Sequence, residues 1–292
     1  MENLSTHDNP TIGIEFELLF RNGMQGIAEH LGVKQYGYSD STNGDENALC
    51  VSWDGSVGSA GGEVKFTRPF KYSEINPLIN QMVLLANHPD AKFGYTRVTK
   101  LDPKYLQHEK VLLHTDTGVH IHFGLPKEYT PLNVFAFIRS MRKYENDLIK
   151  FGYRKCNRWA RGSQMHINTI SKSLDNVNRR YQNGVVLPIS PKVGNHYYGI
   201  NLTNIGNPEK NTIEVRFPHS TIMMSRENIT SYIKLIKDFW EEAFDPNKKE
   251  CRWGNKYVMK YDVFDEVLSG AHVINLHDRK TDKFLGKFKS KI

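Results

Sequence analysis

The chain has only three cysteines in 292 residues, Cys50, Cys156 and Cys251, and no two of them form a CxxC pair. An odd number of widely separated cysteines argues against a disulfide framework and against a zinc site built from thiolates. We therefore interpret all three as buried free thiols without a catalytic role.

Long apolar runs are also missing. No stretch approaches the roughly 18 consecutive apolar residues that a membrane-spanning helix requires. The opening MENLSTHDNP has neither the basic segment nor the apolar segment of a signal peptide. The sequence therefore predicts a cytoplasmic protein with no membrane partner. A GxxxxGK[ST] loop is absent as well, which excludes phosphate binding of the P-loop kind.

The overall composition is that of a globular protein, with 39% apolar, 24% charged and 11% aromatic residues. Lysine and arginine exceed aspartate and glutamate by 39 to 32, and four of these seven excess charges lie in residues 271–292. A positive balance favours polyanionic partners, either nucleic acid or the phosphates of a nucleotide. We expect one catalytic domain over residues 1–270, followed by a solvated basic tail over 271–292.

Hydrophobic periodicity predicts the positions of the helices and strands. Alternation of apolar and polar residues, or short apolar runs, predicts strands at 11–20, 49–53, 62–67, 119–124, 197–202 and 212–217. Three-to-four spacing predicts helices at 24–31, 72–86, 132–150 and 226–244. The polar segment 171–195 carries Gly and Pro residues and is interpreted as a lid or insertion. Because strands come in pairs, the expected fold class is α+β, with an antiparallel sheet forming an open or barrel-like face and helices on its other side.

Acids and imidazoles concentrate on the polar side of these strands. They are Glu15, Glu17, Glu63, His120, His122 and Glu214, joined by Arg216. A solvated sheet face usually mixes Thr, Lys, Ser and Gln, and two carboxylates about 4 Å apart repel by roughly 4 kcal/mol at an effective dielectric near 20. Such a cluster needs cations, and carboxylates with one or two imidazoles suit Mg²⁺ or Mn²⁺ better than zinc.

The order of the short motifs resembles the amidoligase family. The motifs are GIEFE at 13–17, DGS at 54–56, GEV at 62–64, GVHIH at 118–122, CNR at 156–158, YGINL at 198–202 and TIEVRF at 212–217. That family belongs to the carboxylate-amine ligase superfamily, with glutamine synthetase and glutamate-cysteine ligase. The resemblance covers about residues 11–240 and implies a glutamine-synthetase-like catalytic core.

The resemblance also implies site residues. Glu15, Glu17, Glu63, His120 and Glu214 would hold Mg²⁺, with Mn²⁺ as an alternative, around the phosphates of ATP. His122 and Arg216 would contact phosphate. Arg158 would stabilise the transferring phosphoryl group or clamp the substrate carboxylate, although Arg154 and Arg161 compete for that place. Asn201 and Asp54 would belong to the nucleotide site, and Asp54 fits equally well a role in shaping its turn.

The implied reaction is ATP-dependent amide formation from a carboxylate and an amine through an acyl phosphate. The chemistry needs positioning and charge neutralisation rather than an enzyme nucleophile. Two alternative functions remain open. One is a basic nucleic-acid-binding or structural protein, although acids on the polar face disfavour nucleic acid. The other is a cupin-like metal oxygenase, because H-x-H is also a mark of that barrel. The carboxylate, the amine and the oligomeric state are not specified by the sequence.

Overall fold

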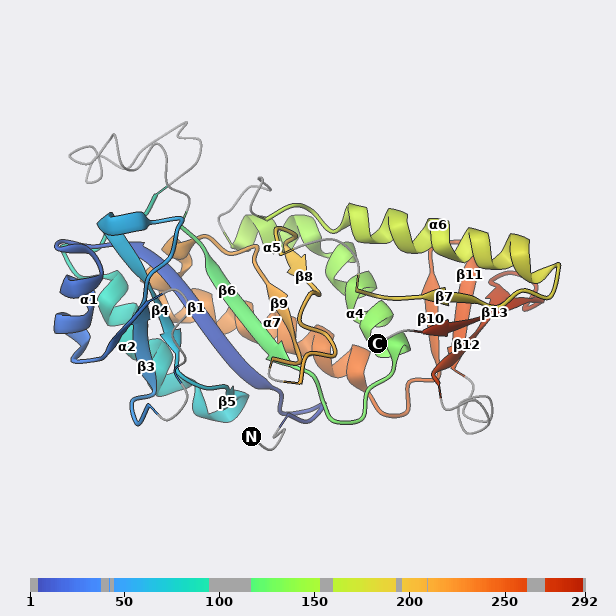
Figure 1. Cartoon of the computed structure of the whole chain (residues 1–292), viewed down its shortest axis with the longest axis horizontal. Helices are drawn as coiled ribbons and strands as arrows, with labels where there is room; N and C mark the ends of the chain where they lie inside the picture. The colour runs from blue at the N-terminus through green and yellow to red at the C-terminus, as the bar shows by residue number, and fades with distance from the viewer. Residues whose placement is uncertain are drawn as a thin grey trace.

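The computed structural model describes residues 5–37, 42, 45–94, 117–152, 160–192, 196–208, 210–261 and 271–290. This part of the chain is a mixed α+β fold with an eight-stranded sheet, a five-stranded sheet and six α-helices. Figure 1 shows the larger sheet on the left and in the centre and the smaller sheet at the right-hand end.

The larger sheet is open. Its main path runs β2 (Gln35–Tyr36), β3 (Leu49–Ser52), β4 (Gly61–Phe66), β1 (Thr11–Leu19), β6 (Val119–Gly124), β9 (Thr212–Val215) and β8 (Ile200–Asn201), with β5 (Phe70–Lys71) pairing with β1 off this path. All pairs are antiparallel except β2 with β3. Each of the six predicted segments contributes a strand to this sheet, and no closed barrel forms among the described strands.

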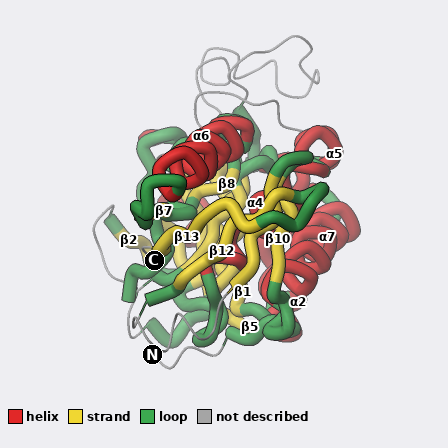
Figure 2. The backbone as a smooth tube through the Cα atoms, turned by 90° about the vertical axis from the view of Figure 1, so that its right-hand side faces the viewer, coloured by secondary structure: helices red, strands yellow, loops and turns green. Residues whose placement is uncertain are grey.

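The smaller sheet takes two of its strands from residues 271–292, where a basic tail was expected. Its order is β10 (Glu250–Trp253), β11 (Tyr257–Tyr261), β12 (Val273–Asp278), β13 (Phe284–Ser290) and β7 (Leu187–Ile189). Ile274, Leu276 and Phe288 are fully buried, so 273–290 is a packed pair of strands rather than a solvated tail. Figure 2 looks onto this end of the molecule, with β10, β12 and β13 toward the viewer.

The six helices are α1 (Gly23–Leu31), α2 (Asn76–Ala86), α4 (Pro131–Lys143), α5 (Glu145–Phe151), α6 (Gln164–Tyr181) and α7 (Arg226–Phe244). The prediction for α7 is confirmed at both ends, and Ser225 caps its first turn by accepting a hydrogen bond from the Asn228 amide. The helix predicted over 72–86 begins at Asn76, and Pro77 is accommodated in its first turn, where no hydrogen bond is lost. The predicted helix over 132–150 is two helices, since the backbone leaves helical geometry at Tyr144.

Helix α6 and strand β7 replace most of the expected lid over 171–195. Leu174 and Val177 are buried along one side of α6. On another side, Ser171 accepts a hydrogen bond from the Trp253 indole, and Asp175 accepts one from Lys256 at 2.8 Å. The helix therefore runs along the molecule and packs against the smaller sheet (Figure 1). The segment is helical and packed rather than a lid, because its apolar residues recur at helical spacing and are buried.

The core lies between the apolar face of the larger sheet and the helices α4 and α7. Ile12, Ile14 and Phe16 of β1 are buried on this face. Trp240 of α7 stacks on Phe123 of β6, with ring centroids 5.4 Å apart, and belongs to the same core cluster. This leaves the opposite face of β1 and β6 free to carry polar side chains. None of the described helices combines the length and apolarity that a bilayer crossing requires.

Candidate functional site

Strand register brings the predicted acids and histidines together on the polar face. In the pairing of β1 with β4, Glu17 lies opposite Glu63. In the pairing of β1 with β6, Glu15 lies opposite His120. His122 lies opposite Glu214 of β9. Directly opposed residues in antiparallel strands have Cβ atoms about 5 Å apart, so this register alone assembles the cluster from four strands.

Two groups of possible ligand atoms form within the cluster. One consists of Glu15, His120 and Glu214, and the other of Glu17, Glu63 and His120, and within each group the ligand atoms lie within 4.8 Å of one another. All five residues predicted to hold metal are thus side by side. His120 belongs to both groups, which makes it the centre of the site.

The two ring nitrogens of His120 face different acids. Nδ1 lies 3.1 Å from Glu15 Oε2 and 3.6 Å from Glu214 Oε1. Nε2 lies 3.6 Å from Glu17 Oε1 but makes no hydrogen bond, although it is buried. A buried nitrogen without a hydrogen-bond partner is costly in a folded protein unless a ligand completes its coordination.

Glu214 is held from two sides. The Asn201 amide of β8 donates a hydrogen bond to Glu214 Oε2 at 2.6 Å, and Arg216 Nη1 lies 2.5 Å from Glu214 Oε1. Burial disfavours the charged form of Glu214, but the charges of His122 and Arg216 outweigh it and hold the pKa of the carboxyl below its usual value. A carboxylate fixed and ionised in this way is a ready ligand for a cation.

Glu15 and His122 form an ion pair, with Oε1 and Nε2 3.2 Å apart. Burial raises the pKa of the Glu15 carboxyl, but the His122 charge and hydrogen bonds with both histidines hold it well below the usual range. For His122, burial acts against the charged form, yet Glu15 and Glu214 raise its pKa overall. The neighbouring acids therefore favour the charged form of His122, and this form suits contact with an anion.

Glu63 has the opposite electrostatic environment. Burial, followed by the negative charges of Glu15, Asp54 and Glu17, raises the pKa of the Glu63 carboxyl well above its usual range. Its one hydrogen-bond donor among the described residues is the Ser52 hydroxyl, at 3.1 Å. Glu17, the other acid of the second group, accepts a hydrogen bond from the Gly118 amide at 2.7 Å. Both of these donors are uncharged, and a divalent cation would supply positive charge to the group.

The donor set fits a hard divalent ion. Carboxylate oxygens dominate, His120 supplies nitrogen, and the unpartnered Nε2 atom points to a missing ligand. Mg²⁺ and Mn²⁺ take such oxygen-rich sites, whereas structural zinc prefers more sulfur and nitrogen. The residues present therefore fit the ions that the sequence implied.

The remaining predicted site residues are less informative. Asp54 shapes its turn by accepting a hydrogen bond from the Ser56 amide at 2.6 Å, and its charge also contributes to the shift at Glu63. Arg158 and Arg154 lie outside the described residues. The backbone of Arg161 bonds to Tyr197 and Gly199 beside β8.

The sequence hypotheses missed Ser52 and Lys65 on the polar face. Ser52 lies opposite Glu63, and Lys65 lies opposite Glu15. Lys65 is two residues after Glu63 on the same strand, so the alternation of β4 is the signal that could have identified it.

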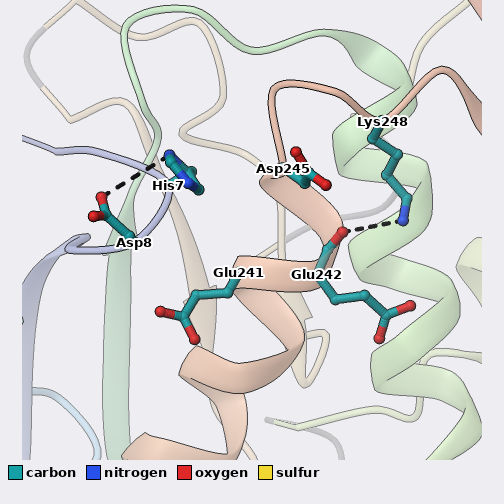
Figure 3. A pocket seen from close by; sticks show the side chains of 6 residues that line it. All are labelled: His7, Asp8, Glu241, Glu242, Asp245 and Lys248. Carbon is teal, nitrogen blue, oxygen red and sulfur yellow. Dashed lines mark hydrogen bonds and ion pairs between the residues drawn. The ribbon is translucent and has the colours of Figure 1, made fainter.

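The cavity in Figure 3 is separate from this cluster. It measures about 480 Å³ and lies near the C-terminal end of α7. Its lining residues are His7, Asp8, Glu241, Glu242, Asp245 and Lys248. None of these belongs to the polar face of the larger sheet. Its carboxylates reach solvent, and exposed acids of this kind are an ordinary surface feature.

Replacing Asn201 by alanine is expected to weaken Mn²⁺ binding about 10- to 100-fold. Asn201 would not be a ligand itself, but its hydrogen bond orients Glu214, and loss of such partners typically has this effect. Titration calorimetry with Mn²⁺ measures the change, with Asn168→Ala on the exposed side of α6 as the control. Equal affinities for Asn201→Ala and the wild type would contradict this role.

Comparison of the chain with protein-family models and with curated proteins gives no match. The functional argument therefore depends on the motifs and on the geometry of the polar face.

Proposed function

We propose that the protein is an ATP-dependent carboxylate-amine ligase with a glutamine-synthetase-like catalytic core. One observation carries the proposal. Five ligands from four strands, far apart in the sequence, converge into two groups that share His120. Paired cation positions beside an arginine suit the transfer of a phosphoryl group, whose charge must be neutralised during the reaction.

The residues divide into a buried layer and a more accessible layer. Glu17, Glu63, His120 and Glu214 are buried and would hold the ions, together with the partly exposed Glu15. Bound Mg²⁺ would neutralise phosphate charge and polarise the phosphoryl oxygens. His122 and Arg216 are partly exposed beside the acids and would bind and orient phosphate oxygens.

In the proposed reaction, a carboxylate oxygen of the substrate attacks the terminal phosphorus of ATP, and ADP leaves. The nitrogen of an amine then attacks the carbonyl carbon of the acyl phosphate, phosphate leaves, and the amine loses a proton. The side chains supply position and charge and form no covalent bond to substrate. The buried Cys50 and Cys251 agree with this scheme, because burial raises the pKa of each thiol, to about 11 and about 12.

The first test is binding of a non-hydrolysable ATP analogue. The wild type is expected to bind it only with Mg²⁺ or Mn²⁺, whereas Glu15→Gln and Glu214→Gln each bind at least about tenfold more weakly, because one ligand is neutralised. Calorimetry measures binding, and phosphate release from ATP with amino acids and hydroxylamine as substrates measures turnover. Glu29→Gln, an exposed acid on α1, is the matched control.

Two outcomes would contradict the proposal. One is metal-independent binding of the analogue with unchanged affinity in both variants. The other is the absence of analogue binding by the wild type together with tight, strongly salt-dependent binding of DNA, which would favour a nucleic-acid-binding protein instead.

A further inference from the structure

Lys65 lies inside the candidate site, although no motif assigned it a role. It is two residues after Glu63 on β4 and therefore projects to the same polar face. Its cross-strand neighbours are Glu15 on β1 and Cys50 on β3. A lysine has thus been placed directly beside one acid from each of the two ligand groups, Glu15 and Glu63.

The ammonium group of Lys65 is only loosely paired. Nζ lies 3.9 Å from Glu63 Oε1, which is an ion-pair distance but too long for a hydrogen bond. Within the described part of the chain, Nζ donates no hydrogen bond to any residue. An ammonium with three donors therefore retains the capacity to bind an oxyanion.

Lys65 also belongs to the accessible layer of the site. Its side chain is 24% exposed, compared with 5% for Glu17 and 4% for His120. His122 at 17% and Arg216 at 15% are exposed to a similar degree. Among the acids, only Glu15, at 29%, is exposed to this degree. A ligand that approaches this face therefore meets three basic side chains and Glu15 before it reaches the buried acids.

Lys65 and Arg216 lie on opposite sides of the Glu15 and His120 pair. Lys65 is the register partner of Glu15 on β4, and Arg216 Nη1 lies 3.4 Å from His120 Nδ1 beyond β6. A phosphoryl group bound by ions in both ligand groups would lie near His120, the residue that the groups share. It would then be within reach of a cationic side chain from each side.

We propose that Lys65 is a substrate-binding residue whose ammonium contacts the terminal phosphate of a nucleoside triphosphate, across the site from Arg216. The inference rests on the proposed ligase function and adds a specific contact to it. The alternative is that Lys65 only offsets the negative charge of the acids. The two roles predict different responses to removal of the ammonium.

The test compares Mn²⁺, ADP and a non-hydrolysable ATP analogue as probes for Lys65→Met. Removing a positive charge beside the acids should leave Mn²⁺ affinity unchanged or raise it several-fold, because repulsion of the ion is relieved. The ATP analogue should bind about tenfold more weakly, through loss of a charge-assisted hydrogen bond. ADP, which lacks the terminal phosphate, should bind within about twofold of the wild type.

Two further variants make the result specific. Lys65→Arg keeps the charge and should recover most of the affinity for the ATP analogue. Lys260→Met removes a lysine of the smaller sheet that pairs with Asp282 at 2.7 Å, and should change none of the three affinities. Thermal melting by circular dichroism confirms that each variant is folded.

The outcomes separate the two proposals. If the wild type binds neither Mn²⁺ nor the ATP analogue, both the ligase function and the role of Lys65 are wrong. If the wild type binds both, but Lys65→Met binds the ATP analogue as tightly as the wild type, the role of Lys65 alone is wrong. Equal weakening of ADP and the ATP analogue would also overturn it, because the contact would not be with the terminal phosphate.

Discussion

Replacing His120 by asparagine is expected to weaken binding strongly at both candidate ion positions, whereas Glu214→Gln and Glu63→Gln should each affect one. His120 is the residue that both ligand groups share. Its Nδ1 faces Glu15, and its Nε2 faces Glu17. An asparagine amide is too short to serve both groups, so we expect Mn²⁺ affinity to fall by at least about 100-fold, or about 2.7 kcal/mol.

Electron paramagnetic resonance of Mn²⁺ counts the bound ions and measures this loss. His30→Asn on the exposed end of α1 is a control that removes an imidazole elsewhere. His120 is buried among carboxylates, so its removal also increases the repulsion between them and lowers stability. Melting temperatures must therefore be recorded together with the Mn²⁺ measurements. A folded His120→Asn variant that binds the same number of Mn²⁺ ions as the wild type would rule out the shared site.

The sequence predicts the polar face well because strand alternation decides which side chains share a face. In β1, four apolar residues point into the core, and Glu15 and Glu17 point away from it. Alternation does not specify which strands are neighbours or how they are aligned, and a shift of one residue would exchange the two faces. The pairing of Glu17 with Glu63, and of Lys65 with Glu15, could therefore be known only from the structure.

The C-terminal half was harder to predict because its apolar residues are sparse. The buried side of α6 is narrow, with Ile170, Leu174 and Val177 among charged and polar residues, and the nearby Gly184 and Pro188 favoured a loop interpretation. In β12, Ile274 and Leu276 do alternate with polar residues, but the excess of lysine in the residues that follow, 279–291, favoured a solvated tail. The local apolar pattern is present but weak in both segments, and packing in and against the smaller sheet stabilises them.

Metal-free protein is expected to lose stability as the pH rises, and Glu63→Gln should remove part of that loss. Burial and the nearby acids raise the pKa of the Glu63 carboxyl well above its usual range, whereas the unfolded chain ionises at the usual value. Between these two pKa values the folded state binds more protons than the unfolded state. The free energy of unfolding therefore falls with rising pH, by at most about 1.4 kcal/mol per pH unit for one group.

Glutamine has the shape of a protonated glutamate and cannot ionise, so Glu63→Gln should melt at a higher temperature than the wild type at about pH 8 and at a similar temperature at about pH 5. Added Mn²⁺ should reverse the order at the higher pH. The ion stabilises the wild type by binding the ionised carboxylate and releasing its proton, while the variant has lost one ligand of the second group.

Differential scanning calorimetry with and without Mn²⁺ across this pH range provides the measurement, with Glu29→Gln as an exposed-acid control. The combination of higher metal-free stability and a smaller Mn²⁺ effect distinguishes a metal ligand from an ordinary buried acid. An ordinary buried acid that served only the fold would leave the Mn²⁺ effect unchanged when replaced. A Glu63→Gln variant that melts below the wild type at about pH 8 without metal would contradict the expected pH dependence, because the charged form of Glu63 would then stabilise the fold. A Mn²⁺ effect equal to that of the wild type would make the assignment of Glu63 to the second ion position wrong.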